Sequence, residues 1–114
     1  MKIVVLKFGG TSVGSTQRIK NVAKIVSNYI KKKIKIIIVS SAMGGFTNKL
    51  INKSLLVSDK FDKSEYDVLL SAGEQISCSL LAGRLRHIGL KSKSFMSWQV
   101  PIISNTEYSN AKIL

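Results

Sequence analysis

The chain has 114 residues, enough for one modest domain and too few for two. With 45% hydrophobic residues, 21% charged residues and one proline, it should pack a core, which excludes a disordered or collagen-like chain. Its one cysteine, Cys78, excludes an internal disulfide and a paired-cysteine zinc site, so we expect a cytoplasmic protein. No apolar run is long enough to cross a bilayer or to form a signal-peptide core, so no membrane partner is expected.

The positive charge is unevenly placed. The formal net charge is +12, from 18 lysines and arginines against 6 acids. Residues 1–58 hold eleven of these cations and no acid, and residues 59–114 hold seven cations and all six acids, so the two parts carry +11 and +1. This asymmetry favours an anionic partner, and by charge alone nucleic acid, a membrane surface or a phosphorylated small molecule would all fit. Only three of the cations are arginines, however, and compositional drift in an adenine- and thymine-rich genome explains much of the excess.

The first half of the chain alternates strand and helix signals. Residues 3–8 form an apolar run that ends at a pair of glycines, which predicts a strand buried on both faces of a parallel sheet. Apolar residues then recur at helical spacing and predict an amphipathic helix over residues 15–32. The apolar run at residues 34–40 predicts a second buried strand, followed by a glycine-rich loop at residues 41–45.

The second half begins with helical signals. The pattern predicts a helix at residues 47–57, a polar linker at 58–64 and a longer helix at 65–87, which Gly89 ends.

The last residues predict short extended elements: a third strand at 91–96, extended backbone around Pro101 at 100–103, and the start of another element at 111–114. Alternating strands and helices predict an α/β fold with a parallel sheet and right-handed crossovers. Three or four strands leave the sheet edges unprotected, so the architecture alone predicts a truncated sheet.

A glycine pair follows each of the first two predicted strands, Gly9 with Gly10 and Gly44 with Gly45. The carboxyl ends of parallel strands face one crevice, where glycines let backbone amides approach a phosphate and helix N-termini favour an anion. Lys7 adds a full positive charge beside the first pair. The spacing matches neither a Walker A loop nor the dinucleotide-binding pattern, and an ordinary tight turn explains each pair equally well.

A third group of polar residues lies in the longer predicted helix. Ser71 and Glu74 have the spacing of a capping box, in which the two side chains satisfy each other's backbone amides at a helix start. Alternatively, Glu74 lies beside the crevice and binds an ammonium group of a substrate. Gly73, within an apolar helical stretch, indicates a kink or a close approach.

Four motifs in this order resemble the N-terminal part of an aspartokinase. They are VLKFGGTSV at residues 5–13, VSSAM at 39–43 with Thr47 and Asn48, LSAGEQIS at 70–77 and WQVPI at 98–102. The resemblance covers essentially the whole chain and implies the amino acid kinase fold, a three-layer α/β/α arrangement with a mainly parallel sheet. It also implies an enzyme activity, transfer of the ATP γ-phosphate to the β-carboxylate of L-aspartate, with Mg²⁺. The product, 4-phospho-L-aspartate, is the first intermediate toward lysine, threonine, methionine and diaminopimelate.

The resemblance further implies roles at the nucleotide. Lys7 corresponds to the family's catalytic lysine, which contacts the ATP phosphates and stabilises the migrating phosphoryl group. Gly9 and Gly10 form its anion cradle together with Phe8, and Ser41 lies where nucleotide and substrate meet.

Thr47 and Glu74 correspond to aspartate-binding residues, with Glu74 binding the substrate's ammonium group. The attacking group is already a carboxylate, so no general base is needed, and positioning and charge stabilisation supply the rate. The resemblance assigns no metal ligand in this chain.

Complete aspartokinases are several times longer than this chain. We therefore expect residues 1–114 to be the N-terminal part of an amino acid kinase domain, with the C-terminal half and the regulatory ACT domains absent. On this hypothesis the chain is a remnant of a decayed gene or one product of a split gene, inactive unless a second polypeptide supplies the missing half. Ser40 and Ser97 depart from the family pattern, in which an aliphatic residue and a glycine are usual.

Alternative functions remain open at this point. Another amino acid kinase, of the acetylglutamate or glutamate kinase type, would share the early lysine and glycine pair. The positive charge of this chain would also suit a small nucleic-acid-binding module. However, the lysine cluster at residues 31–35 lacks the interleaved aromatic residues and arginines that are typical of such a module. A functionless remnant is the third alternative.

Three residues of chemically versatile types are interpreted as structural. His87 is expected at a helix end, Cys78 as a small buried hydrophobic residue, and Trp98 as a packing residue.

Overall fold

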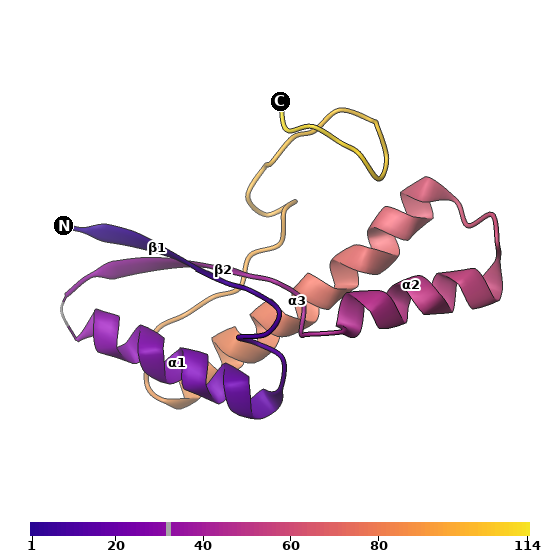
Figure 1. Cartoon of the computed structure of the whole chain (residues 1–114). Coiled ribbons are helices and arrows are strands. Elements are labelled where there is room, and N and C mark those ends of the chain that lie inside the picture. The colour runs from indigo at the N-terminus through magenta and orange to yellow at the C-terminus, as the bar shows by residue number, and fades with distance from the viewer. Residues whose placement is uncertain (32) are drawn as a thin grey trace.

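The computed structural model describes residues 1–31 and 33–114 (Figure 1). The described elements follow the order β1 (Ile3–Phe8), α1 (Thr16–Ile30), β2 (Lys35–Ser40), α2 (Phe46–Val57) and α3 (Lys63–His87). All five elements were predicted from the sequence to within two residues at each end. Residue 32, at which the first helix was predicted to end, lies outside the described residues. None of the described helices is long and apolar enough to cross a membrane.

The two strands form a parallel pair, as the sequence predicted. Ile3 is aligned with Lys35, and the register continues to Phe8, which is aligned with Ser40. α1 makes the crossover between the strands, because parallel neighbours require a long connection. It begins at Ser15, whose side-chain oxygen accepts a hydrogen bond from the Arg18 backbone N–H.

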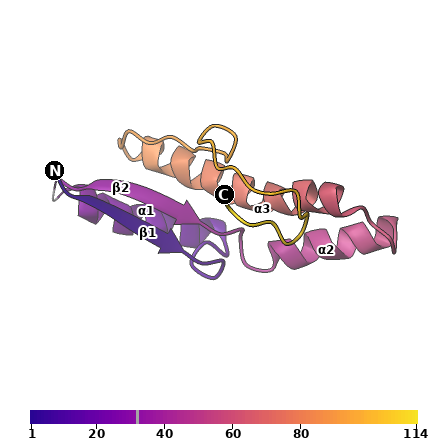
Figure 2. The same cartoon turned by 90° about the horizontal axis from the view of Figure 1, so that it is seen from above.

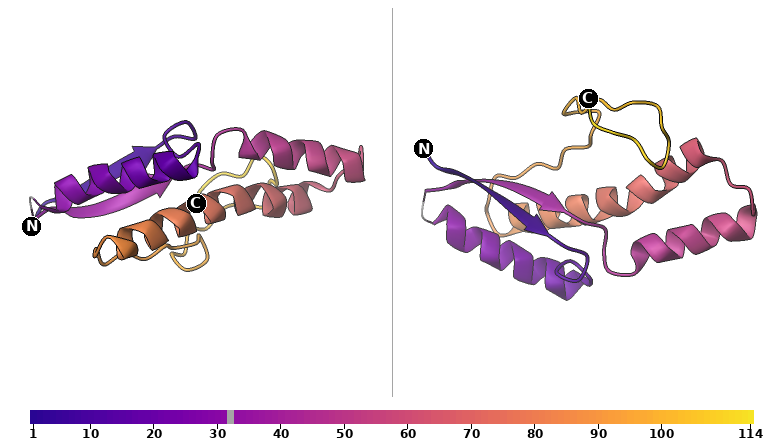
Figure 3. Two further views of the ribbon diagram at one scale, coloured as in Figure 1. Left: turned by 90° about the horizontal axis from the view of Figure 1, so that it is seen from below. Right: turned by 45° about the horizontal axis from the view of Figure 1, so that its top comes forward.

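The core lies on one face of this sheet. Its buried residues come from the loop after β1, from α1 and from α3: Val13, Ile19, Val22, Ala23, Val26, Leu81 and Leu85. Leu6 and Phe8 of β1 and Ile36 and Ile38 of β2 pack against them. Figure 2 shows α1 running along the two strands with α3 beside them, and Figure 3 shows α3 continuing beyond the sheet to form a hairpin with α2.

The opposite face of the sheet is exposed, so the prediction of strands buried on both faces is wrong for this structure. Burial alternates along β1 and β2, as in a sheet covered on one side only. The α/β class and the parallel sheet are confirmed, and within residues 1–31 and 33–114 the helices α1 and α3 supply a single covering layer.

The predicted third strand at residues 91–96 is also wrong. The segment has no strand pairing and lies along α3 instead. The Ser92 backbone oxygen accepts a hydrogen bond from Arg86 Nε at 2.7 Å, and its hydroxyl donates to the Ala82 backbone oxygen at 2.9 Å. Both hydrogen bonds tie this segment to α3, so local anchoring takes the place of sheet pairing.

The C-terminal residues form turns rather than the predicted extended backbone. Residues 97–101 form a turn. Residues 111–114 were predicted to start another element, and there Ile113 forms an isolated antiparallel bridge with Ser104. The Asp67 carboxylate of α3 holds this segment by accepting hydrogen bonds from the Ser109 backbone N–H at 2.8 Å and hydroxyl at 3.2 Å.

The capping-box interpretation of Ser71 is wrong, because the N-cap of α3 is Asp62, nine residues earlier. The Asp62 side chain accepts hydrogen bonds from the backbone N–H groups of Ser64 at 2.9 Å and Glu65 at 3.1 Å, and from the Ser64 hydroxyl. Ser71 is therefore inside the helix, where its hydroxyl donates to the Val68 carbonyl.

Replacing Asp62 with alanine is expected to lower the melting temperature at pH 7, because α3 loses its N-cap. The Ser64 hydroxyl, and then the Glu65 N–H, hold the pKa of Asp62 below its ordinary value of 3.8. The stabilising effect of the carboxylate is therefore present above the unfolded-state pKa and is lost as pH falls through the lower folded-state pKa. Thermal melts followed by circular dichroism between pH 2 and pH 7 measure the melting temperatures of the Asp62→Ala variant and the unsubstituted chain. The difference between the two melting temperatures should shrink as the pH falls. A constant difference across this range, or an equal effect of Asp59→Ala in the preceding linker, would contradict the assignment.

Candidate functional site

The glycine loops that follow β1 and β2 pack directly on each other. The Ser41 backbone N–H donates to the Phe8 carbonyl at 3.0 Å, which joins the loops where the strands end. A Cβ atom on Gly10 would lie 3.1 Å from the Ala42 backbone oxygen, and one on Gly44 would lie 3.2 Å from the Gly10 oxygen. Close backbone contact thus favours glycine at positions 10 and 44, whereas a Cβ atom on Gly9 or Gly45 would have nothing within 4 Å.

Each loop then leads into a helix. In the first loop the Gly9 carbonyl accepts hydrogen bonds from the N–H groups of Ser12 at 3.0 Å and Val13 at 3.3 Å. In the second, Gly45 has φ +76° and immediately precedes α2, with no side-chain cap on that helix. Among the described residues, the backbone N–H groups of Gly10 and Gly44 make no hydrogen bond to protein. Two free amides and an uncapped helix N-terminus are the groups that favour an anion.

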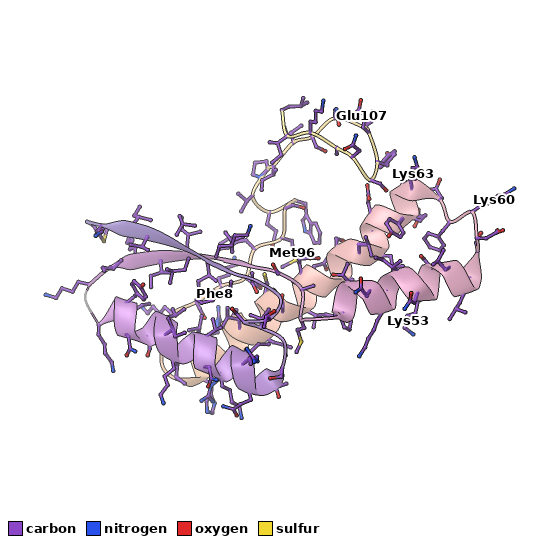
Figure 4. All side chains as sticks on the ribbon, in the orientation of Figure 1. Phe8, Lys53, Lys60, Lys63, Met96 and Glu107 are labelled. Carbon is purple, nitrogen blue, oxygen red and sulfur yellow. The ribbon has the colours of Figure 1, made fainter. Side chains whose placement is uncertain are left out.

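Lys7 and Phe8 point to opposite faces of the sheet. Lys7 is exposed and aligned with Val39, and within the described part of the chain its ammonium group has no hydrogen bond or ion pair. Phe8 packs its ring against the core, between the strands and α1 (Figure 4). Lys7 is therefore free to bind a ligand, whereas only the backbone of Phe8 faces the loops.

Ser41 is held in place by a residue that sequence reasoning did not assign. The Ser77 hydroxyl, fully buried on α3, donates to the Ser41 backbone oxygen at 2.6 Å and lies 3.5 Å from the Ser40 hydroxyl. Ser77 was part of the LSAGEQIS motif, but a serine in an apolar helical stretch carries no sequence signal for a contact 36 residues away. Ser40, which departs from the family pattern, is a partner in this contact.

Gly73 brings α3 against the second loop. A Cβ atom on Gly73 would lie 2.9 Å from Ala42 Cβ and 3.3 Å from Phe46 Cδ1, so the close approach indicated by the sequence is confirmed. Thr47, in the first turn of α2, and Glu74, in the middle of α3, are each one residue from this contact. The structure thus brings Lys7, Gly9, Gly10, Ser41, Thr47 and Glu74 onto neighbouring elements around the two loops.

Glu74 borders a pocket of about 270 Å³. The pocket lies between α3 and the segment after it, and its lining includes Ser71, Cys78, Phe95 and Trp98. Cys78 is half-buried rather than fully buried, and it also lines an apolar cavity of about 410 Å³ against β2. Burial, followed by the nearby Glu74 carboxylate, raises the pKa of the Cys78 thiol above its ordinary value.

The remaining chemistry of the described residues is limited. No group of three or more histidine, cysteine, aspartate or glutamate side chains in residues 1–31 and 33–114 could hold a metal ion. His87 lies exposed in the last turn of α3, with Arg84 and Arg86, as the sequence predicted for a cation near a helix C-terminus.

A parallel strand pair whose loops meet at its carboxyl edge is the arrangement of an α/β protein whose ligand site lies beyond the strand ends, and here a free lysine lies beside the loops. The chain belongs to the amino acid kinase family, whose family model matches residues 2–113. Within this family, it is similar to proteins named aspartokinase.

The aspartokinase of Geobacillus stearothermophilus is 44% identical over 114 residues, which are 100% of this chain and 28% of that protein. The aspartokinase of Rickettsia felis is 40% identical over 116 residues, which cover 99% of this chain and 29% of that protein. The crystal structure of aspartate kinase from Synechocystis matches with a TM-score of 0.79 and 38% identity, over 82% of this chain and 16% of that chain. The chain thus spans less than a third of these relatives and matches their N-terminal region.

Proposed function

We propose that this chain supplies the N-terminal part of an aspartate kinase active site. The reaction is transfer of the ATP γ-phosphate to the β-carboxylate of L-aspartate, which gives 4-phospho-L-aspartate, and we place it in the cytoplasm. The observation that carries the proposal is the backbone contact between the two glycine loops beside Lys7, which creates an anion-binding edge. Similarity to aspartokinases over the whole chain supports aspartate as the phosphoryl acceptor.

The loops bind the ATP phosphates. The free N–H groups of Gly10 and Gly44 donate to phosphate oxygens, and the N-terminus of α2 adds its dipole. The Gly9 carbonyl accepts the hydrogen bonds that hold the first loop in its turn, and Phe8 anchors this turn to the core. Ser41 lies between the nucleotide and the substrate, and Ser77 fixes its backbone.

Lys7 stabilises charge on the phosphoryl group during transfer. A lysine ammonium group is a mobile point charge with three donors, and Lys7 has no competing partner in the described part of the chain. Charge stabilisation by a positioned cation is the main contribution that a protein makes to phosphoryl transfer. Lys7 is therefore the residue on which the rate depends most.

Thr47 and Glu74 bind aspartate. The exposed Glu74 carboxylate pairs with the substrate ammonium group, and the Thr47 hydroxyl hydrogen-bonds a substrate carboxylate. The substrate's β-carboxylate needs no deprotonation at neutral pH, so this site requires no general base. Mg²⁺ bound with ATP supplies further neutralisation of the phosphate charge.

The proposal is tested by a chimera in which this chain replaces the aligned N-terminal region of the Geobacillus stearothermophilus aspartokinase. Aspartyl phosphate, trapped as the hydroxamate, is measured with MgATP and aspartate. We expect activity from the chimera and a loss of about 10²-fold or more in kcat for Lys7→Ala. Lys53→Ala, which removes an outward-pointing lysine of α2 (Figure 4), is the matched control and should leave the rate unchanged.

An inactive but folded chimera, or equal rates for Lys7→Ala and the control, would contradict the proposal. Phosphorylation of glutamate or acetylglutamate in place of aspartate would assign the chain to another kinase of the same family.

A further inference from the structure

The chain after α3 turns back and runs along that helix. Ser92 is held near the end of α3 by the two hydrogen bonds described above. Residues 95–98 line the pocket of about 270 Å³ beside the middle of α3. Ser109 is then hydrogen-bonded to Asp67, near the start of the helix. The C-terminal segment, residues 90–114, is therefore antiparallel to α3, and Figure 1 shows its yellow end beside the beginning of the helix.

The pocket and the anchor for Ser109 share one face of α3. Asp67, Ser71, Glu74 and Cys78 follow one another at intervals of four, three and four residues, which is the spacing of a single stripe on a helix. The last three of these residues line the pocket. With a rise of about 1.5 Å per residue, Asp67 is roughly 10 Å from Glu74 along the helix. Asp67 therefore lies on the face that carries the pocket, beyond its far end.

The end of the C-terminal segment is a closed loop. The Asn105 backbone N–H donates to the Lys112 carbonyl at 3.0 Å, and the Leu114 N–H donates to the Ile103 carbonyl at 3.0 Å. The Asn105 side-chain oxygen also accepts a hydrogen bond from the Lys112 N–H at 3.1 Å. These bonds make residues 103–114 one unit, so a single anchor can hold the whole loop.

Asp67 supplies that anchor. Its carboxylate accepts two hydrogen bonds from Ser109, and within residues 1–31 and 33–114 these are the only hydrogen bonds that join residues 97–114 to a helix or strand. Ser109 has φ +63°, a backbone conformation that serine seldom adopts, and the hydrogen bonds hold it there. Hydrogen bonds to a charged group are stronger than those between neutral groups, so a carboxylate suits this position.

We propose that Asp67 is a positioning residue for the substrate pocket beside Glu74. Because Ser92 is anchored at one end of α3 and Ser109 at the other, residues 95–98 are held across the pocket between the two anchors. The pocket is then formed before an amino-acid substrate arrives, so binding does not have to order the segment. This role rests on the proposed function for the identity of the substrate, whose ammonium group pairs with Glu74.

The chain's one cysteine reports on the segment that covers it. Cys78 lines the same pocket and is half-buried, so a thiol reagent reaches it faster when the segment is released. In the 114-residue chain we expect Asp67→Ala to raise the labelling rate of Cys78 about tenfold, the shift in an equilibrium that follows loss of a hydrogen bond to a charged group. Glu65→Ala is the matched control, because it removes an exposed carboxylate two residues away, and should leave the rate unchanged. Circular dichroism checks that both variants keep their helices.

Two further variants separate the lost anchor from the lost charge, which by itself favours the reactive thiolate. Asp67→Asn removes the charge but keeps an oxygen that can accept the Ser109 N–H, so it should recover part of the protection. Ser109→Ala should speed the labelling by about threefold in the unsubstituted chain. Combined with Asp67→Ala it should have no further effect, because its hydroxyl then has no partner to lose.

The effect on the substrate is measured in the chimera described above. Asp67→Ala should raise KM for aspartate about tenfold and change kcat and KM for ATP by less than about twofold, because the loops that bind ATP belong to other elements. Glu65→Ala should leave all three values unchanged.

Equal labelling of Cys78 in the Asp67→Ala and Glu65→Ala variants would overturn the proposal, as would additive effects of Asp67→Ala and Ser109→Ala. An active chimera in which Asp67→Ala changes KM for aspartate no more than Glu65→Ala does would also overturn it. A chimera that forms no hydroxamate, together with Asp67-dependent labelling in the 114-residue chain, would support the anchored segment and count against the proposed function.

Discussion

Replacing Leu81 with alanine is expected to lower the free energy of unfolding by about 2–5 kcal/mol, the loss that follows truncation of a buried leucine. Leu81 is 3% exposed on α3 and belongs to the core that joins α3 to α1 and the sheet. Native domains are stable by only about 5–15 kcal/mol, so this loss is a large fraction of the total. Urea unfolding followed by circular dichroism at 222 nm measures it.

The neighbouring residue offers a matched control. Leu80 is 44% exposed on the same helix, so Leu80→Ala should change the free energy of unfolding by less than about 0.5 kcal/mol. Similar effects for the two substitutions would show that α3 does not pack on the sheet through the face described above.

The substitution Gly73→Leu is expected to lower the free energy of unfolding by roughly 3 kcal/mol, because the leucine side chain overfills the contact between α3 and the second glycine loop. Even a Cβ atom there would lie 2.9 Å from Ala42 Cβ, which belongs to a loop fixed by backbone hydrogen bonds. The same substitution at Gly83, which has nothing within 4 Å of its Cβ position, should raise stability by about 1 kcal/mol through helix propensity. Paired urea titrations should therefore give effects of opposite sign.

The cause is checked by a compensating change. Gly73→Ala should be destabilising by itself, and adding Ala42→Gly should recover part of the loss because it removes the atom that clashes. Full additivity of the two changes would show that the residues do not press on each other, which would contradict the contact.

The sequence by itself predicted every described strand and helix from local pattern. The apolar run ending at Gly9 and Gly10 and the 3.6-residue spacing in α1 depend only on neighbouring residues, so periodicity was sufficient. The order of motifs from Lys7 to Trp98 likewise predicted the family, which the family match confirms. The roles of Lys7, Thr47 and Glu74 in catalysis and binding stay predictions.

Only the tertiary structure decided which surfaces meet. Ser71 and Glu74 have capping-box spacing, but the helix begins nine residues earlier at Asp62. The Asp62 carboxylate accepts hydrogen bonds from the first free N–H groups of the helix, so Ser71 lies in its interior. Residues 91–96 have a strand-like pattern, but a strand needs a partner's backbone, and Ser92 is held by α3 instead. Local pattern cannot report a partner that is distant in sequence. For the same reason the burial of one sheet face, the exposure of the other and the contact between Ser77 and Ser41 became visible only in three dimensions.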